Sequence, residues 1–216
     1  MNGLKISVAI MAHPDRSFNA ERLMRALHNQ GFYTVSLCYD NGEGEWGNGV
    51  RSLKAHTDSD YHCVIQDDAI LSEYFYDNVV KAINNLPTKG LISFYTGTVR
   101  PKAEKVQAAL FNAKSISASW LEGPTLYWGV GLCIHTDDID LMLKYVKNIE
   151  LPYDRRIGQY YQVRHIPVYY TIPSLVDHDY RLGSLMQNDY ASEPRKARNY
   201  HSGEVYHWNN KSVKIV

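Results

Sequence analysis

The sequence lacks a surplus of either charge, a long apolar run and a low-complexity segment. Its 216 residues hold 23 lysines and arginines against 23 aspartates and glutamates, so overall charge predicts neither a nucleic-acid binder nor a membrane-surface protein. No stretch approaches the roughly 20 apolar residues that span a bilayer, and the N-terminus has no signal-peptide core. These absences predict a soluble, cytoplasmic protein with no membrane span and no evident obligate protein partner.

Cysteine is also scarce. Cys38, Cys63 and Cys133 are odd in number, widely spaced, and each lies in an apolar stretch. This spacing fits neither a disulfide framework nor a zinc site, so all three are predicted to be reduced core thiols. The chain length suits one domain over residues 1–216, in which 190–216 form a basic, aromatic tail.

Apolar runs and helical periodicities alternate along the chain, which predicts a layered α/β sandwich. Strands are expected at 6–11, 34–38, 63–65, 91–95, 116–120, 132–135 and 167–172. Helices are expected after Asn19, at 50–56, at 75–86, around 106–110, after Thr136 and around 157–164, with a glycine-rich surface loop at 41–49.

An acidic pair follows the most apolar of these strands. Cys63, Val64 and Ile65 lead into Asp67 and Asp68, and ligands of open α/β sheets collect beyond the carboxyl ends of strands. Two adjacent carboxylates repel each other, and a hard divalent ion would compensate them. The alternative is that they cap a helix beginning at Ala69.

Other candidate residues accompany this pair. Arg51 could meet a phosphate beside a metal, or it could belong to a solvated helix face. His178 follows a strand and could complete a mixed carboxylate and imidazole metal site, although a lone histidine is more often structural. Asp137 and Asp138 suit the first turn of a helix and are interpreted as structural.

A resemblance covers nearly the whole chain. The order of the His13-Pro14-Asp15-Arg16 loop, Asp40, Gly49-Val50-Arg51, Gln66-Asp67-Asp68-Ala69 and Pro173 to His178 resembles small bacteriophage-type glycosyltransferases of the GT-A fold. Lipooligosaccharide glycosyltransferases carry a related acidic pair. The first loop also resembles that of zinc-dependent sugar deacetylases, but Arg16 stands where their motif needs a second acid.

The resemblance implies a single-domain, Rossmann-like GT-A fold with a mostly parallel mixed sheet between helices. It implies a nucleotide-sugar donor, with a UDP-sugar expected, and a divalent Mn²⁺ or Mg²⁺ cofactor. Asp68, His178 and Asp67 would bind the metal. The residues expected to line the donor pocket are Ala12, His13, Pro14, Arg16, Asp40, Arg51 and Asp67.

For the chemistry, Arg51 is expected to stabilise the departing diphosphate. If configuration is inverted, a carboxylate must take the proton of the acceptor hydroxyl, and Asp154 is the leading candidate because its loop precedes a late helix. If configuration is retained, no such base is required, and the sequence leaves both alternatives open.

The expected acceptor is a hydroxymethylated pyrimidine in phage DNA, because the resemblance is to phage-type enzymes, and this would place the protein in the host cytoplasm. The residues expected to bind the acceptor are Trp128, Gly129, Arg195 and Arg198, and the tail adds Trp208 for base stacking. A carbohydrate or lipooligosaccharide acceptor is the alternative. A non-catalytic nucleotide- or nucleic-acid-binding module is the alternative of another class.

Overall fold

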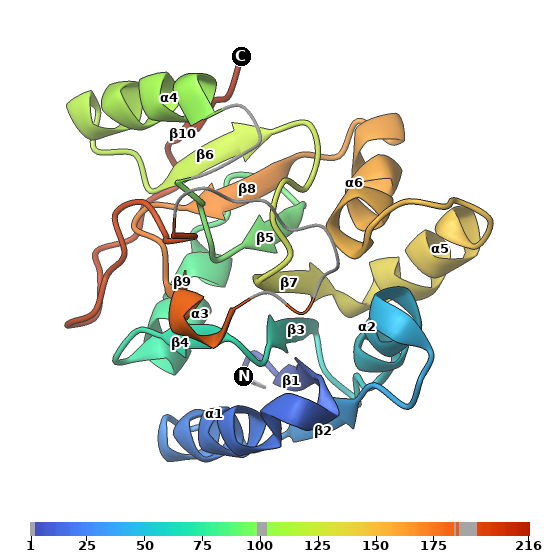
Figure 1. Ribbon diagram of the computed structural model, residues 1–216. Coiled ribbons are helices and arrows are strands. Elements are labelled where there is room, and N and C mark those ends of the chain that lie inside the picture. Colours follow the sequence, from blue (N-terminus) through green and yellow to red (C-terminus); the bar gives the residue numbers. More distant parts are fainter. Residues whose placement is uncertain (1–2, 99–102, 184, 186–193) are drawn as a thin grey trace.

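A mixed eight-stranded sheet runs through the middle of the protein (Figure 1). The structure, a computed structural model, describes residues 3–98, 103–183, 185 and 194–216. The strand order is β10-β6-β8-β5-β7-β3-β1-β2. The strands are β1 (Ile6–Ala12), β2 (Val35–Tyr39), β3 (Tyr61–Gln66), β5 (Leu91–Ser93), β6 (Trp120–Gly123), β7 (Gly131–His135), β8 (Val168–Thr171) and β10 (Ser212–Lys214).

The sheet is parallel at the β2 edge, where β1 pairs with both β2 and β3. β7 then lies antiparallel to β3 and to β5, while β5 and β8 are parallel. Two short strands, β4 (Ala69–Leu71) and β9 (Val176–His178), form a separate antiparallel pair. The chain therefore returns its late segment to the carboxyl end of β3.

Helices cover the sheet. They are α1 (Ser17–Asn29), α2 (Gly44–Lys54), α3 (Phe75–Asn84), α4 (Ala103–Ser115), α5 (Thr136–Val146) and α6 (Tyr153–Val163), with short 3-10 turns at Pro14–Arg16 and Tyr180–Leu182. α1 joins β1 to β2, and α2 then crosses back to β3, so right-handed connections place these two helices on opposite faces. α2 packs against α5 and α6 (Figure 1).

The core is continuous along the sheet, because the central strands are buried on both faces. Val8, Ile10, Val64 and Ile65 have no exposed surface. Cys38, Cys63 and Cys133 are buried free thiols, as predicted. Across the described ranges, the helices are too short or too polar to traverse a bilayer. The architecture confirms the predicted α/β class, with a mixed sheet between helices.

Several sequence predictions about individual elements were wrong. The expected loop at 41–49 is largely helix, since α2 begins at Gly44. Asn19 lies inside α1, which begins two residues earlier. The strand expected at 116–120 is displaced to Trp120–Gly123. Ala69 begins a strand and not a helix, so the interpretation of Asp67 and Asp68 as helix caps is wrong.

The C-terminal segment is part of the fold. β10 extends the sheet beside β6, and Trp208, only 5% exposed, packs on Trp120 with ring centroids 5.4 Å apart. Trp208 is therefore a core residue, and it is not accessible for stacking a base. The division of the chain into a single domain stays a prediction.

Candidate functional site

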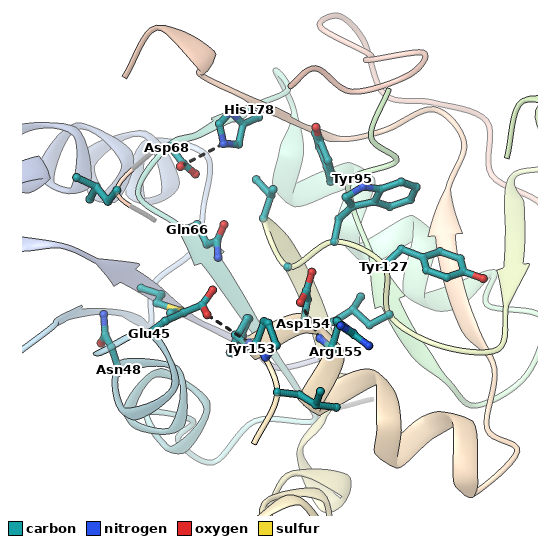
Figure 2. A pocket seen from close by; sticks show the side chains of 18 of the residues that line it. Glu45, Asn48, Gln66, Asp68, Tyr95, Tyr127, Tyr153, Asp154, Arg155 and His178 are labelled. Carbon is teal, nitrogen blue, oxygen red and sulfur yellow. Dashed lines mark hydrogen bonds and ion pairs between the residues drawn. The ribbon is translucent and has the colours of Figure 1, made fainter. Parts of the chain in front are cut away.

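A cavity of about 1090 Å³ opens beyond the carboxyl ends of β1, β2 and β3 (Figure 2). Ala12 and His13 enter it from the end of β1, Asp40 from the end of β2, and Gln66 to Asp68 from the end of β3. The opposite wall comes from the 124–130 loop and the start of α6. This is the edge of the sheet at which α/β proteins bind ligands.

Arg16 joins the two aspartates. Its Nη1 donates to Oδ1 of Asp67 at 3.0 Å and to Oδ2 of Asp68 at 2.8 Å, and its Nη2 donates to the carbonyl oxygen of Gly183 at 2.5 Å. All three charged side chains are largely buried. The guanidinium therefore supplies one counter-charge to the pair, a role that sequence analysis did not assign to it.

The two carboxylates have different surroundings. Burial raises the pKa of Asp67 despite the opposing effects of the His13 N–H, which donates to its Oδ2 at 2.7 Å, and of Arg16. At Asp68 burial also acts to raise the pKa, but His178 and Arg16 outweigh it and the pKa is lowered. The pKa of Asp68 is thus lowered and that of Asp67 raised, which makes Asp68 the stronger acid of the pair.

His178 faces Asp68 because β4 and β9 pair in register, with Ala69 opposite His178. The backbone N–H of Asp179 donates to the carbonyl of Asp68 at 2.7 Å and fixes this approach. Nε2 of His178 lies 3.3 Å from Oδ2 of Asp68 (Figure 2). A ring nitrogen and a carboxylate oxygen that face each other at this distance need a proton or a cation between them.

The Asp68 and His178 side chains fit a divalent ion. Ligand bonds of about 2.0–2.1 Å place neighbouring ligands of an octahedral ion about 3 Å apart, close to the observed separation. Oδ1 of Asp68 and Nδ1 of His178 are buried and have no hydrogen-bond partner in the described part of the chain. Within that part no three His, Cys, Asp or Glu side chains form a complete metal cluster. The protein would therefore supply two ligands, leaving positions for phosphate and water.

Asp154 projects into the same cavity from the first turn of α6 (Figure 2). Its neighbour Tyr153 is 1% exposed and fixes the start of the helix. The Tyr153 ring lies between two glycines, because a Cβ added at Gly49 would be 2.5 Å from the ring and one added at Gly129 would be 2.9 Å from it. Gly129 thus makes room for Tyr153, which positions Asp154.

We expect Gly49→Ala to destabilise the protein. The added methyl group would overlap the Tyr153 ring, and overpacking of this kind costs about 1–3 kcal/mol, more than the gain of about 1 kcal/mol in helix propensity. Urea unfolding measures the difference. In a Tyr153→Leu background the same substitution should become neutral or stabilising, and an equal loss in both backgrounds would contradict the steric explanation.

The pKa of the Asp154 carboxyl is raised towards neutral pH. Burial, with a smaller contribution from the nearby Glu45 carboxylate, raises its pKa to about 6 against the lowering effects of the Arg155 backbone N–H and side chain. Glu45 lies in the first turn of α2 and its Oε2 accepts from the Tyr153 N–H at 3.4 Å (Figure 2). A carboxyl with this pKa can accept a proton near neutral pH.

Aromatic side chains form the wall beside Asp154. Trp128 contacts Tyr95, Tyr127 and Tyr170 edge-to-face, with ring centroids 5.6–6.1 Å apart. The Tyr170 hydroxyl accepts from the Tyr127 N–H at 2.8 Å and donates to the Thr125 carbonyl at 2.7 Å. These contacts hold the 124–128 loop in place.

The residues at the ends of β1 and β2 and in the first turns of α2 form the other end of the cavity. Asp40 lines it, and its Oδ1 accepts from the N–H groups of Gly42, Glu43 and Gly44, which orders the turn into α2. Asn48 donates to the Ala12 carbonyl at 2.9 Å, so its buried Oδ1 is left as an acceptor without a partner among the described residues. Pro14 begins the 3-10 turn after His13 and is not among the lining residues.

The structure brings most of the predicted site residues together. The predicted residues that line the cavity are Ala12, His13, Arg16, Asp40, Asp67, Asp68, Trp128, Gly129, Asp154, His178 and Arg195. Arg51 lies outside this lining and donates to Glu43 and to the Tyr39 carbonyl. Arg198 is likewise outside, bound to the carbonyls of Gly97 and Thr98 and to Gln107.

Sequence analysis missed Glu45, Asn48, Gln159 and Gln162, which also line the cavity. The spacing of Glu45 and Asn48 would have placed them on one helix face had α2 been predicted from Gly44. Gln159 and Gln162 are three residues apart on the predicted helix that follows Asp154, and this shared face was the available signal for them.

No family model matches the sequence, and no curated protein matches it. Among solved structures, a mutant Drosophila β1,4-galactosyltransferase 7 in complex with manganese, UDP-Gal and xylobiose is similar with a TM-score of 0.44 and 11% sequence identity. That match covers 88% of this chain and 77% of the other. Function is therefore inferred from the geometry of the cavity.

Proposed function

We propose that the protein is a metal-dependent glycosyltransferase that moves a sugar from a nucleoside diphosphate sugar to an acceptor hydroxyl. One observation carries the proposal: the Asp68 and His178 pair and the Asp154 carboxyl, whose pKa is raised to about 6, enter one cavity from different walls. A cation site beside a proton acceptor is what this transfer requires. A non-catalytic module has no need of either.

Asp68 and His178 would hold Mn²⁺ or Mg²⁺, which when bound neutralises the diphosphate charge that develops as the leaving group departs. Arg16 keeps the Asp67 carboxylate beside this site and adds a positive charge close to it. We assign Arg16, in place of Arg51, to the stabilisation of the diphosphate, because Arg51 is bound to Glu43 outside the cavity.

The nucleoside would lie at the end of the cavity formed by Ala12, His13, Asp40 and Asn48. A UDP-sugar, the donor that the sequence resemblance implies, is the first donor to test.

Asp154 would act as the general base. Its carboxylate accepts the proton of the acceptor hydroxyl while the oxygen bonds to the anomeric carbon, and the bond from that carbon to the diphosphate oxygen breaks. The nucleoside diphosphate leaves with the bonding electron pair. A side-chain base of this kind implies inversion at the anomeric carbon, so the expected product has the opposite anomeric configuration to the donor.

The proposal is tested by incubating the protein with a panel of nucleotide sugars and Mn²⁺ and measuring release of the nucleoside diphosphate. We expect release from one class of donor and its loss on chelation with EDTA. Release that is equal with and without metal would contradict the metal assignment, and no release from any donor would contradict the proposed activity.

The pH dependence of transfer should report on Asp154. Because a base acts in its deprotonated form, kcat/KM should rise with pH through about 6 and then level off. Glu45→Gln removes a negative charge that raises the pKa of Asp154, so the midpoint should move to lower pH. Glu43→Gln, which alters an acid paired with Arg51 outside the cavity, is the control. A midpoint that is the same in the Glu45 variant and the parent would exclude this coupling.

A further inference from the structure

We propose that the acceptor is an uncharged saccharide that binds beside Asp154, against the wall that α6 and the 124–128 loop form together, in the part of the cavity away from the nucleoside end. This inference rests on the proposed glycosyl transfer. It is drawn from the side chains that line that part, from the aromatic wall and from the charges around them.

The first observation concerns two side-chain amides, those of Gln159 and Gln162. Gln159 and Gln162 both line the cavity and lie on one face of α6, five and eight residues after Asp154. In the described part of the chain neither side chain makes a hydrogen bond with the protein. An amide both donates and accepts, as a hydroxyl does, whereas a phosphate only accepts. These two side chains therefore match a ligand that is rich in hydroxyl groups.

The second observation is the aromatic wall on the 124–128 loop, which packs against α6. The rings of Tyr127 and Trp128 line the cavity and are held by Tyr95 and Tyr170, so their positions are fixed before a ligand binds. Aromatic groups with an apolar body and a polar tip suit the C–H faces of a sugar ring. A rigid wall also reduces the entropy lost on binding.

The third observation is the charge of the cavity. The part of the cavity lining that the structure describes carries five acidic side chains, those of Asp40, Glu45, Asp67, Asp68 and Asp154. It carries three guanidinium groups, those of Arg16, Arg155 and Arg195. Arg16 forms ion pairs with Asp67 and Asp68. A nucleic-acid backbone would bring further negative charge to this surface, whereas DNA-binding sites present a basic one. An uncharged acceptor avoids that repulsion.

The test compares acceptors directly. The protein is incubated with UDP-sugars, Mn²⁺ and either a panel of mono- and disaccharides or a duplex containing hydroxymethylated pyrimidine, and products are identified by mass spectrometry. We expect sugar on a saccharide and none on the duplex at low salt. The Gln159→Leu, Gln162→Leu double variant should raise KM for the saccharide by about tenfold or more.

Arg164→Leu is the matched control, since Arg164 ends the same helix, is exposed and does not line the cavity. Transfer to DNA and to no saccharide would overturn the inference while leaving glycosyl transfer in place. An unchanged KM in the double variant would also overturn it. If the protein neither hydrolyses a donor nor binds UDP with Mn²⁺, the proposed function fails and the inference with it.

Discussion

Replacing Asp68 by Asn should reduce sugar transfer and donor hydrolysis by at least about a hundredfold, because the cation site loses its charged ligand. Asparagine keeps the shape of the side chain, and the Asp68 carbonyl still accepts from the Asp179 N–H. We therefore expect a folded protein. Initial rates at saturating Mn²⁺, together with thermal melting followed by circular dichroism, measure the two effects separately.

A matched control separates catalysis from stability in this experiment. Asp138 is another buried acid, 8% exposed and paired with Lys89 at 2.9 Å, but it lies in α5 outside the cavity. Each substitution removes an ion pair made by a buried carboxylate, so a loss of stability is expected in both variants. Asp138→Asn should nevertheless retain the transfer rate. Parent activity in the Asp68 variant would contradict the metal assignment.

Replacing Asp154 by Asn should reduce transfer by about 10²–10⁴-fold while leaving metal-dependent donor binding unchanged. The amide cannot take the proton of the acceptor hydroxyl, but its oxygen can still accept from the Arg155 N–H, which now lies 2.7 Å from Oδ1 of Asp154. Single-turnover transfer and calorimetric titration of the donor distinguish the two steps.

Asp140→Asn, at an exposed position of α5, controls for the loss of one acidic charge. It should leave both transfer and donor binding unaltered. If the Asp154 variant transfers sugar at the parent rate, another group accepts the proton, or the reaction retains configuration without a dedicated base. If it loses donor binding as well, Asp154 belongs to the donor site and not to the acceptor side.

The acidic end of β3 could be located from the sequence because it depends on local patterns. An apolar run of Cys63 to Ile65 predicts a buried strand, and the polar residues that follow must lie at its carboxyl end. The sequence suggested His178 as a metal ligand, but it could not show that His178 lies beside Asp68. Its contact with Asp68 depends on the pairing of two strands of three residues each, β4 and β9, that are far apart in the chain.

The helix at 44–54 was not predicted over its full length because its first half contains glycines. Gly47 and Gly49 are unfavourable inside a helix, so local propensity favours a loop. The Tyr153 ring, from more than a hundred residues away, occupies the space beside Gly49 and stabilises the helix through tertiary packing. For the same reason Glu45 and Asn48 could not be assigned to the site from the sequence.

Arg16 was placed in the donor loop by sequence analysis, but its contact with both aspartates could not be foreseen. The residue lies more than fifty positions before Asp67, and the contact depends on the parallel pairing of β1 with β3. Arg51 was predicted to meet the phosphates because it precedes the acidic strand in sequence. The structure instead shows it bound to Glu43 at the start of its own helix.

Calorimetric titration of UDP into the protein, with Mn²⁺ and then with EDTA, tests the central claim most directly. The account predicts binding that requires the metal and that is lost in Asp68→Asn and weakened in His178→Ala, while Asp138→Asn binds as the parent does. Binding that is equal with Mn²⁺ and with EDTA, or that survives unchanged in the Asp68 variant, would contradict it.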